Sequence, residues 1–92
     1  MNDEIISELQ IINEKGLHAR AAAKLVDTIE RFDAAAEVSF DNRTVSADSI
    51  MGLLMLAASK GTTIEFRAWG PESAGLTDAV SALLADRFGE DM

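Results

Sequence analysis

The apolar residues of this chain switch between a strand-like and a helix-like spacing, and this alternation restricts the fold more than any other feature. Residues 62–69 (TTIEFRAW) alternate apolar and polar side chains, as a half-buried strand does. From residue 19 to about residue 31, by contrast, Ala22, Leu25 and Ile29 recur on one helical face. A chain of 92 residues buries only about 60 to 65% of its unfolded surface, so these elements must share one core.

Two further segments are predicted to form strands. Residues 8–13 (ELQIIN) contain closely spaced apolar side chains and end at a polar turn, which indicates a short first strand. Residues 36–47 (AEVSFDNRTVSA) alternate around the pair Asp41 and Asn42. This pattern predicts a hairpin of two strands with that pair as its turn.

A second and a third helix complete the order of elements. Ser49 is predicted to cap the N-terminus of a helix in residues 49–61, with Gly61 as its C-terminal stop. After Pro71 the apolar spacing is helical again, and residues 89–92 (GEDM) are expected to be a frayed tail. The order βαββαβα predicts one α+β domain over residues 1–92, an open-faced sandwich whose mostly antiparallel four-stranded sheet carries three helices on one face.

The composition excludes several classes of function. Sixteen acidic and eight basic residues give a net charge of −8, so the surface should repel nucleic acid and anionic membranes. With no cysteine and one histidine, neither a disulfide nor a metal site is expected. The acidic N-terminus does not resemble a signal peptide, and no run of about 18 apolar residues occurs. We expect a cytoplasmic monomer with no metal and no cofactor.

The sequence also lacks the usual signatures of an independent enzyme. It contains no phosphate-binding glycine loop, no carboxylate pair at a recognisable catalytic spacing and no Ser-His-Asp arrangement. Any group transfer should therefore depend on partner proteins.

The only histidine, His18, lies in GLHARAAAKLV (residues 16–26), at the predicted start of the first helix. The N–H groups of a first turn lack intrahelical partners and carry the positive end of the helix dipole, which favours anions and disfavours imidazolium. A neutral imidazole is a nucleophile. If it accepted a phosphoryl group, the free N–H groups and Arg20 could hold the negative charge, and Lys24 would make the patch more basic.

From spacing alone, a structural role for these residues is the more frequent outcome. A lone histidine at a helix start is more often a cap or a surface residue than a nucleophile. Arg20 and Lys24 would usually belong to a solvated helix face. Both interpretations stay open at this level.

The sequence GLHAR, followed by a helix of small residues, resembles the active-site segment of the HPr family, the histidine phosphocarriers of the bacterial phosphoenolpyruvate-dependent phosphotransferase system. Residues 48–66 (DSIMGLLMLAASKGTTIEF) resemble the second helix and fourth strand of that family, and the predicted element order is that of its fold. The likeness runs from about residue 8 to residue 88. The segments LLMLAASKG and GPE, with the ending FGED, look closer to the nitrogen-related branch.

The resemblance implies a relay of phosphoryl groups. His18 would accept the group on Nδ1 from a phosphorylated enzyme I-type protein and pass it to an enzyme IIA-type protein, with Arg20 stabilising it. One position departs from the family pattern, because Ala21 stands where proline is usual. Ala21 keeps an N–H that could contact the phosphoryl oxygens, but the rigidity of the turn and the rate of transfer are in question.

The second predicted helix has apolar residues on two faces, and a two-layer fold can bury only one of them. The face expected to be buried consists of Leu53, Leu56 and Ala57. The face expected to form an exposed protein-binding patch consists of Ile50, Met51 and Leu54. Methionine suits a surface that meets several partners because its side chain repacks easily. In the family, the residues matching this patch contact the enzyme I and enzyme IIA proteins, although the fold could also bury both faces.

The resemblance adds a second role to Ser49 beside its role as a helix cap. In many relatives the matching serine is phosphorylated by an ATP-dependent HPr kinase/phosphorylase, which here would add nearly two negative charges beside the patch. Leu17 and Lys24, on either side of His18, complete the predicted partner-binding residues.

Two alternatives to a phosphoryl carrier stand beside this prediction. The domain could be a regulatory binding module that docks through Ser49, Ile50, Met51 and Leu54, with phosphorylation as a switch. It could also be an unrelated α+β interaction domain in which His18 is incidental. The GLHAR segment, the length and the element order favour the carrier.

Overall fold

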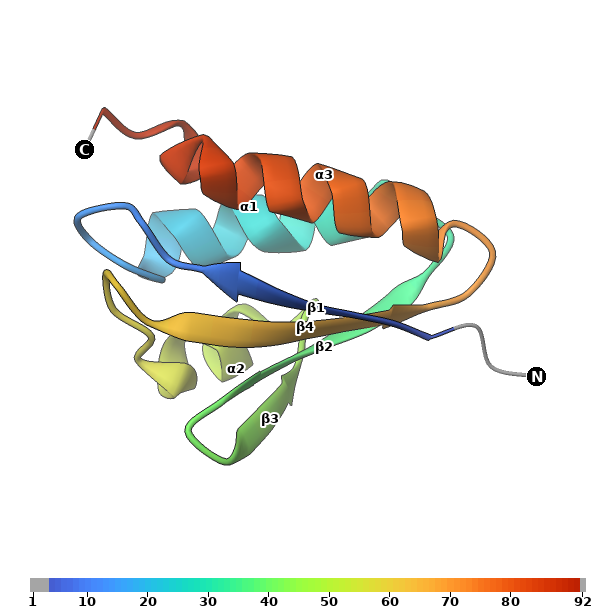
Figure 1. Ribbon diagram of the computed structural model, residues 1–92, viewed down its shortest axis with the longest axis horizontal. Coiled ribbons are helices and arrows are strands. Elements are labelled where there is room, and N and C mark those ends of the chain that lie inside the picture. Colours follow the sequence, from blue (N-terminus) through green and yellow to red (C-terminus); the bar gives the residue numbers. More distant parts are fainter. Residues whose placement is uncertain (1–3, 92) are drawn as a thin grey trace.

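The computed structural model describes residues 4–91. In chain order its elements are β1 (Ile5–Gln10), α1 (Ala19–Glu30), β2 (Ala35–Phe40), β3 (Arg43–Ser46), α2 (Ile50–Leu56), β4 (Thr63–Trp69), α3 (Ser73–Ala85) and the 3₁₀ turn η1 (Arg87–Gly89). The strands form one antiparallel sheet in the order β1-β4-β2-β3. Helices α1 and α3 lie side by side over one face of this sheet, and α2 packs against α1 and β3 (Figure 1). The predicted α+β open-faced sandwich is confirmed.

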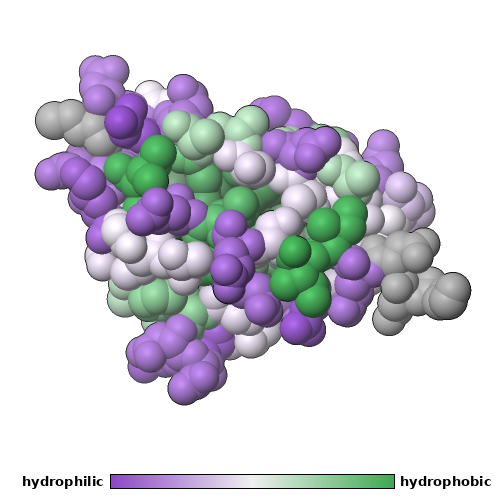
Figure 2. All heavy atoms as spheres, in the orientation of Figure 1, coloured by the Kyte–Doolittle hydropathy of each residue, from purple (hydrophilic) through white to green (hydrophobic). Residues whose placement is uncertain are grey.

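The core lies between the sheet and the helices. Every second residue of β4 is buried, namely Ile64, Phe66 and Ala68, and these side chains meet the apolar faces of α1 and α3. Full burial of a Leu, Ile or Phe side chain contributes about 1.5–3 kcal/mol. In Figure 2, hydrophilic side chains are spread over the visible face, and apolar residues show between them in several areas.

The hairpin and the first helix follow the sequence pattern closely. Asp41 and Asn42 both adopt positive φ angles, 53° and 64°, as a two-residue type I′ turn requires. Helix α1 buries the predicted face, including Leu25 and Ile29, and ends one residue before the expected Arg31, which is its C-cap.

The first strand and the end of the second helix differ from prediction. Strand β1 spans Ile5–Gln10 rather than residues 8–13, because its partner β4 begins at Thr63, opposite Gln10. Ile11 is buried outside the strand, and this burial produced the misleading apolar pattern. The prediction that Gly61 stops α2 is also wrong, since the helix ends at Leu56 and Ala57 takes the left-handed conformation with φ 54°.

The C-terminal segment is the largest departure from prediction. Residues 89–91 of the predicted frayed tail are placed against the domain, whereas Met92 lies outside the described residues. After α3, positive φ angles at Arg87, Phe88 and Gly89 turn the chain back, and Phe88 is completely buried. Figure 1 shows that this tail lies at the same end of the molecule as the loop between β1 and α1.

Candidate active site at the start of helix α1

The loop before His18 is fixed by close contact with the segment after α2. Gly16 has φ 66°, and a Cβ atom there would lie 2.7 Å from the carbonyl oxygen of Ala58, so only glycine fits. The next residue, Leu17, donates its N–H to the same oxygen over 2.9 Å and is buried. The backbone is therefore held in place immediately before the histidine.

His18 is the N-cap residue of α1, but its side chain does not cap the helix. Its backbone is extended (φ −84°, ψ −178°), and its carbonyl oxygen accepts from the Ala22 N–H over 2.8 Å. The ring makes no hydrogen bond to the first-turn amides and is 25% exposed. Those amides are the donors that an N-cap side chain ordinarily helps to satisfy.

The ring instead contacts the C-terminal tail. Nε2 of His18 lies 2.5 Å from Oε2 of Glu90, whose side chain is 13% exposed. The other carboxylate oxygen accepts from Nδ2 of buried Asn13 over 3.0 Å. These two hydrogen bonds, that of His18 first, hold the pKa of Glu90 below its usual value despite the opposing effect of burial.

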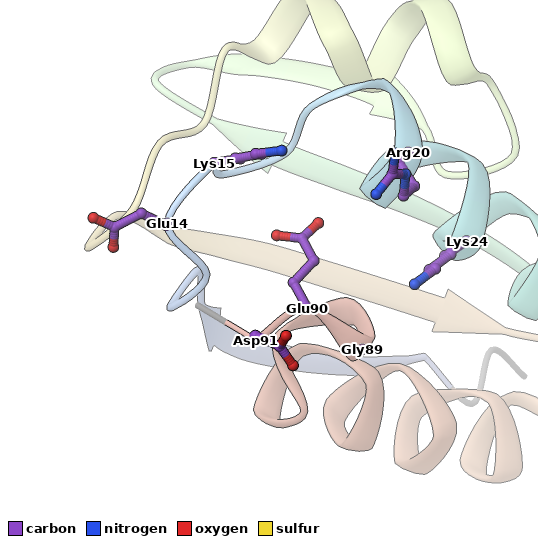
Figure 3. Close-up of a pocket in the computed structure, with 7 residues that line it drawn as sticks. All are labelled: Glu14, Lys15, Arg20, Lys24, Gly89, Glu90 and Asp91. Carbon is purple, nitrogen blue, oxygen red and sulfur yellow. The ribbon is translucent and has the colours of Figure 1, made fainter.

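Basic side chains surround this carboxylate. A hollow of about 340 Å³ lies between the start of α1 and the tail, and it is lined by Glu14, Lys15, Arg20, Lys24, Gly89, Glu90 and Asp91. Figure 3 shows the side chain of Glu90 rising from the tail into the space between Lys15 and Arg20. The hollow thus combines three cationic side chains with three carboxylates, one of which, Glu90, contacts His18.

The predicted patch on α2 is exposed. Met51 is 70% exposed and Ile50 is 39% exposed, whereas Leu54 is half-buried against the core. Met55, one turn after Met51, is 67% exposed and belongs to the same apolar face, although it was not predicted. Its spacing of four residues from Met51 was the available signal.

The other predicted residues of α2 and of the loop before His18 agree with prediction only in part. On the face of α2 expected to be buried, Leu53 and Leu56 are buried, but the prediction for Ala57 is wrong, because as the C-cap it is exposed. Leu17 is buried, so it offers little surface to a partner. Ser49 caps α2 as expected, with its Oγ accepting from the Gly52 N–H over 3.0 Å.

Within residues 4–91 no group of three or more His, Cys, Asp or Glu side chains is arranged to hold a metal ion. Across the same residues no helix is long and apolar enough to cross a membrane.

The sequence matches the family model described as the PTS HPr component phosphorylation site over residues 5–86. The chain belongs to the HPr family. It is 46% identical to Phosphocarrier protein HPr of Xylella fastidiosa, over 91% of this chain and 94% of that protein. Phosphocarrier protein NPr of Klebsiella oxytoca is 40% identical over 90% of this chain and 93% of its own length. The crystal structure of HPr-C-His from Thermoanaerobacter tengcongensis superposes with a TM-score of 0.91 at 35% identity, covering 96% and 99% of the two chains.

As a member of the HPr family, the chain is a phosphocarrier of the phosphotransferase system, and its partners are proteins of that system. The predicted family and carrier function are confirmed, and the alternative of an unrelated interaction domain is wrong. Both HPr and NPr proteins are among its relatives, so the nitrogen-related branch stays a prediction.

Two polar residues of the site, Asn13 and Glu90, were not predicted from the sequence. Asn13 is close to His18 in sequence, but its side chain reaches the site by donating to Glu90, which follows His18 by 72 positions. The signal that could have located Glu90 was Phe88, because a large apolar residue after a helix is unlike the composition of a frayed end.

Proposed function

We propose that His18 is the residue on which this carrier holds the phosphoryl group. The observation that carries the proposal is the position of the ring, which is partly exposed at a helix N-terminus that it does not cap. A nucleophilic nitrogen there lies beside amide donors without intrahelical partners, so a bound phosphoryl group gains hydrogen bonds and a favourable dipole.

Arg20 and Lys24 supply positive charge to the same place. Both line the hollow that also contains Glu90, and Arg20 is exposed, so its guanidinium is free to turn toward a phosphoryl oxygen. A carrier must also release its cargo, and contacts that bind too tightly would raise the barrier to the second transfer. The exposed guanidinium of Arg20 suits this intermediate strength, and the half-buried ammonium of Lys24 is already shared with the carbonyl oxygen of Phe88.

Ala21 replaces the proline usual in the family without disturbing the helix start. It is buried in the first turn, and the first helical hydrogen bond is made by the next amide, that of Ala22. The N–H of Ala21 therefore adds a donor that proline would lack, and α1 begins at Ala19.

We further propose that the apolar patch of Ile50, Met51, Leu54 and Met55 receives the donor and the acceptor. The donor would be an enzyme I-type protein and the acceptor an enzyme IIA-type protein, both meeting a cytoplasmic, monomeric carrier built as one domain. Exposed methionines support this role because they adapt to differently shaped partners. Phosphorylation of Ser49 by an HPr kinase/phosphorylase would place charge beside the patch and would disturb the cap of α2.

The test is phosphorylation with phosphoenolpyruvate and a cognate enzyme I. The wild-type protein should gain one acid-labile phosphate, and His18→Ala should gain none while keeping its circular dichroism spectrum. Label that persists in His18→Ala would place the nucleophile elsewhere.

The exposed patch also favours the second candidate function, a regulatory binding module. Met51→Glu should weaken capture of the unphosphorylated chain by its partner. Ile6→Glu, at another exposed apolar position, on β1, should not. Equal binding by both variants would argue against the patch as the docking surface.

A further inference from the structure

The contact between His18 and Glu90 has a defined direction. The pKa of Glu90 is lowered, so its carboxylate is ionised near neutral pH and can only accept hydrogen bonds. One oxygen already accepts from Asn13, and the other lies 2.5 Å from Nε2 of His18. The donor in this second bond must therefore be an Nε2–H group, which leaves the lone pair of the neutral ring on Nδ1.

The carboxylate is held in this position by a tail anchored at three points. Phe88 is completely buried in the core, and its carbonyl oxygen accepts from Nζ of Lys24 over 2.5 Å. Glu90, two residues after Phe88, accepts a hydrogen bond from Nδ2 of Asn13 in the loop that precedes His18. The same Nδ2 also donates to the carbonyl oxygen of Gly16 over 2.8 Å. Contacts with the core, with α1 and with the loop before His18 thus hold the tail, and with it the carboxylate, beside the ring.

We propose that Glu90 is a positioning residue for phosphoryl transfer, which holds the ring proton of His18 on Nε2 and so presents Nδ1 as the attacking atom. This inference rests on the proposed role of His18 as the phosphoryl acceptor. Glu90 acts through the ring and does not itself receive the group.

The transfer step then needs no separate base, because the attacking Nδ1 carries no proton. The Nδ1 lone pair forms a new bond to phosphorus while the bond between phosphorus and the leaving atom of the phosphorylated donor breaks, and that electron pair goes to the leaving atom. Nε2 keeps its proton, so the ring of His18 becomes positively charged as the new bond forms. The carboxylate at Nε2 stabilises this charge, as a buried acid does for the imidazolium of a Ser-His-Asp triad.

The negative charge of Glu90 does not exclude the incoming phosphoryl group. Glu90 contacts the ring at Nε2, and Nδ1 is a different corner of the imidazole. Lys15, Arg20 and Lys24 line the same hollow, so the carboxylate and a phosphoryl group would share cationic neighbours. The site can therefore hold both anions on opposite sides of one cationic ring.

The matched variants are Glu90→Gln, which removes the charge and keeps the shape, and Asp91→Asn, which removes the next carboxylate along the chain. ¹⁵N NMR of histidine-labelled protein, at a pH where the ring is neutral, reports which nitrogen carries the proton. Wild type and Asp91→Asn should show the Nε2–H form, whereas Glu90→Gln should show a mixture of tautomers. Single-turnover phosphorylation by phosphorylated enzyme I should be about tenfold slower in Glu90→Gln, the size of one lost charge-assisted hydrogen bond.

The outcomes separate this inference from the function on which it rests. If wild type is not labelled on His18, the proposed acceptor is wrong whatever the tautomer. If wild type is labelled but its neutral ring carries the proton on Nδ1, the positioning role is wrong. The role is also overturned if Glu90→Gln keeps the wild-type tautomer or transfers at the wild-type rate.

Discussion

The starts of α1 and α2 show two ways of using a polar N-cap residue. Both helices follow an extended residue, His18 in one case and Ser49 in the other. Ser49 turns its side chain onto its own helix and accepts from the Gly52 N–H. His18 turns its side chain away, toward Glu90 on the tail.

The difference bears on the proposed role of His18 as the phosphoryl acceptor, because only Ser49 caps its own helix with its side chain. A capped N-terminus has part of its donor capacity satisfied within the chain, whereas the first-turn amides of α1 receive no such bond from His18. Glu90 makes this possible, because it gives the imidazole a polar partner other than the helix. The chain therefore keeps hydrogen-bond donors available beside the ring that we propose as the nucleophile.

Replacing His18 with serine, the residue that caps α2, should have the largest effect on phosphorylation. His18→Ser replaces the imidazole with a residue that caps helices well, so we expect phosphorylation by enzyme I to fall to background. The helix should persist, because serine at an N-cap stabilises helices by about 1 kcal/mol relative to alanine. Phosphorylation assays and thermal denaturation, with His18→Ala as the reference, measure both effects. A Ser variant less stable than the Ala variant would contradict the comparison of the two caps.

Releasing the tail should affect stability strongly. Phe88→Ala removes a completely buried side chain, and such changes typically lower the free energy of unfolding by about 3–5 kcal/mol. The loss should also free Glu90 from His18, which is detectable as a change in the ring signals by NMR. Phe40→Ala, at a half-buried position at the end of β2, should cost less. Equal losses in urea denaturation would show that the tail contributes little to the core.

The sequence predicted contacts between residues close together in the chain better than contacts between residues far apart in it. The cap at Ser49 and the helix after His18 depend on residues within a few positions, and both were predicted with the correct start. The contact between His18 and Glu90 depends on how the end of α3 returns to the start of α1, which no short-range pattern records. The early end of α2 at Ala57 had a similar cause, because the following segment is held by its contact with the loop before His18.

Removing the cap of α2 should have a moderate and strictly local effect. Ser49→Ala loses the hydrogen bond to Gly52, and we expect the free energy of unfolding to fall by about 1 kcal/mol. Ser81→Ala, at an exposed position within α3, should not destabilise the protein, because alanine is the better helix former there. Phosphorylation of His18 should be unchanged in both variants. A slower reaction in Ser49→Ala would mean that the two helix starts are coupled.

The smallest expected effect is on stability in acid, and its sign follows from the lowered pKa of Glu90. A carboxyl group whose pKa is lower in the folded state than its ordinary value of 4.5 stabilises the fold above that pH. This contribution disappears as the pH falls through the folded-state value. Urea denaturation of wild type and Glu90→Gln should therefore differ near neutral pH and converge at low pH.

Glu14 provides the matched control for this measurement, because its pKa is also lowered, by an exposed contact with Lys60. Exposed ion pairs contribute little and are screened by salt, so the effect of Glu14→Gln should vanish in high salt. The effect of Glu90→Gln should persist there, since its hydrogen bonds to His18 and Asn13 are partly buried. If high salt removes the stability effects of Glu14→Gln and Glu90→Gln equally, the carboxylate of Glu90 is not held against the His18 ring. The comparison of the two helix starts would then fail.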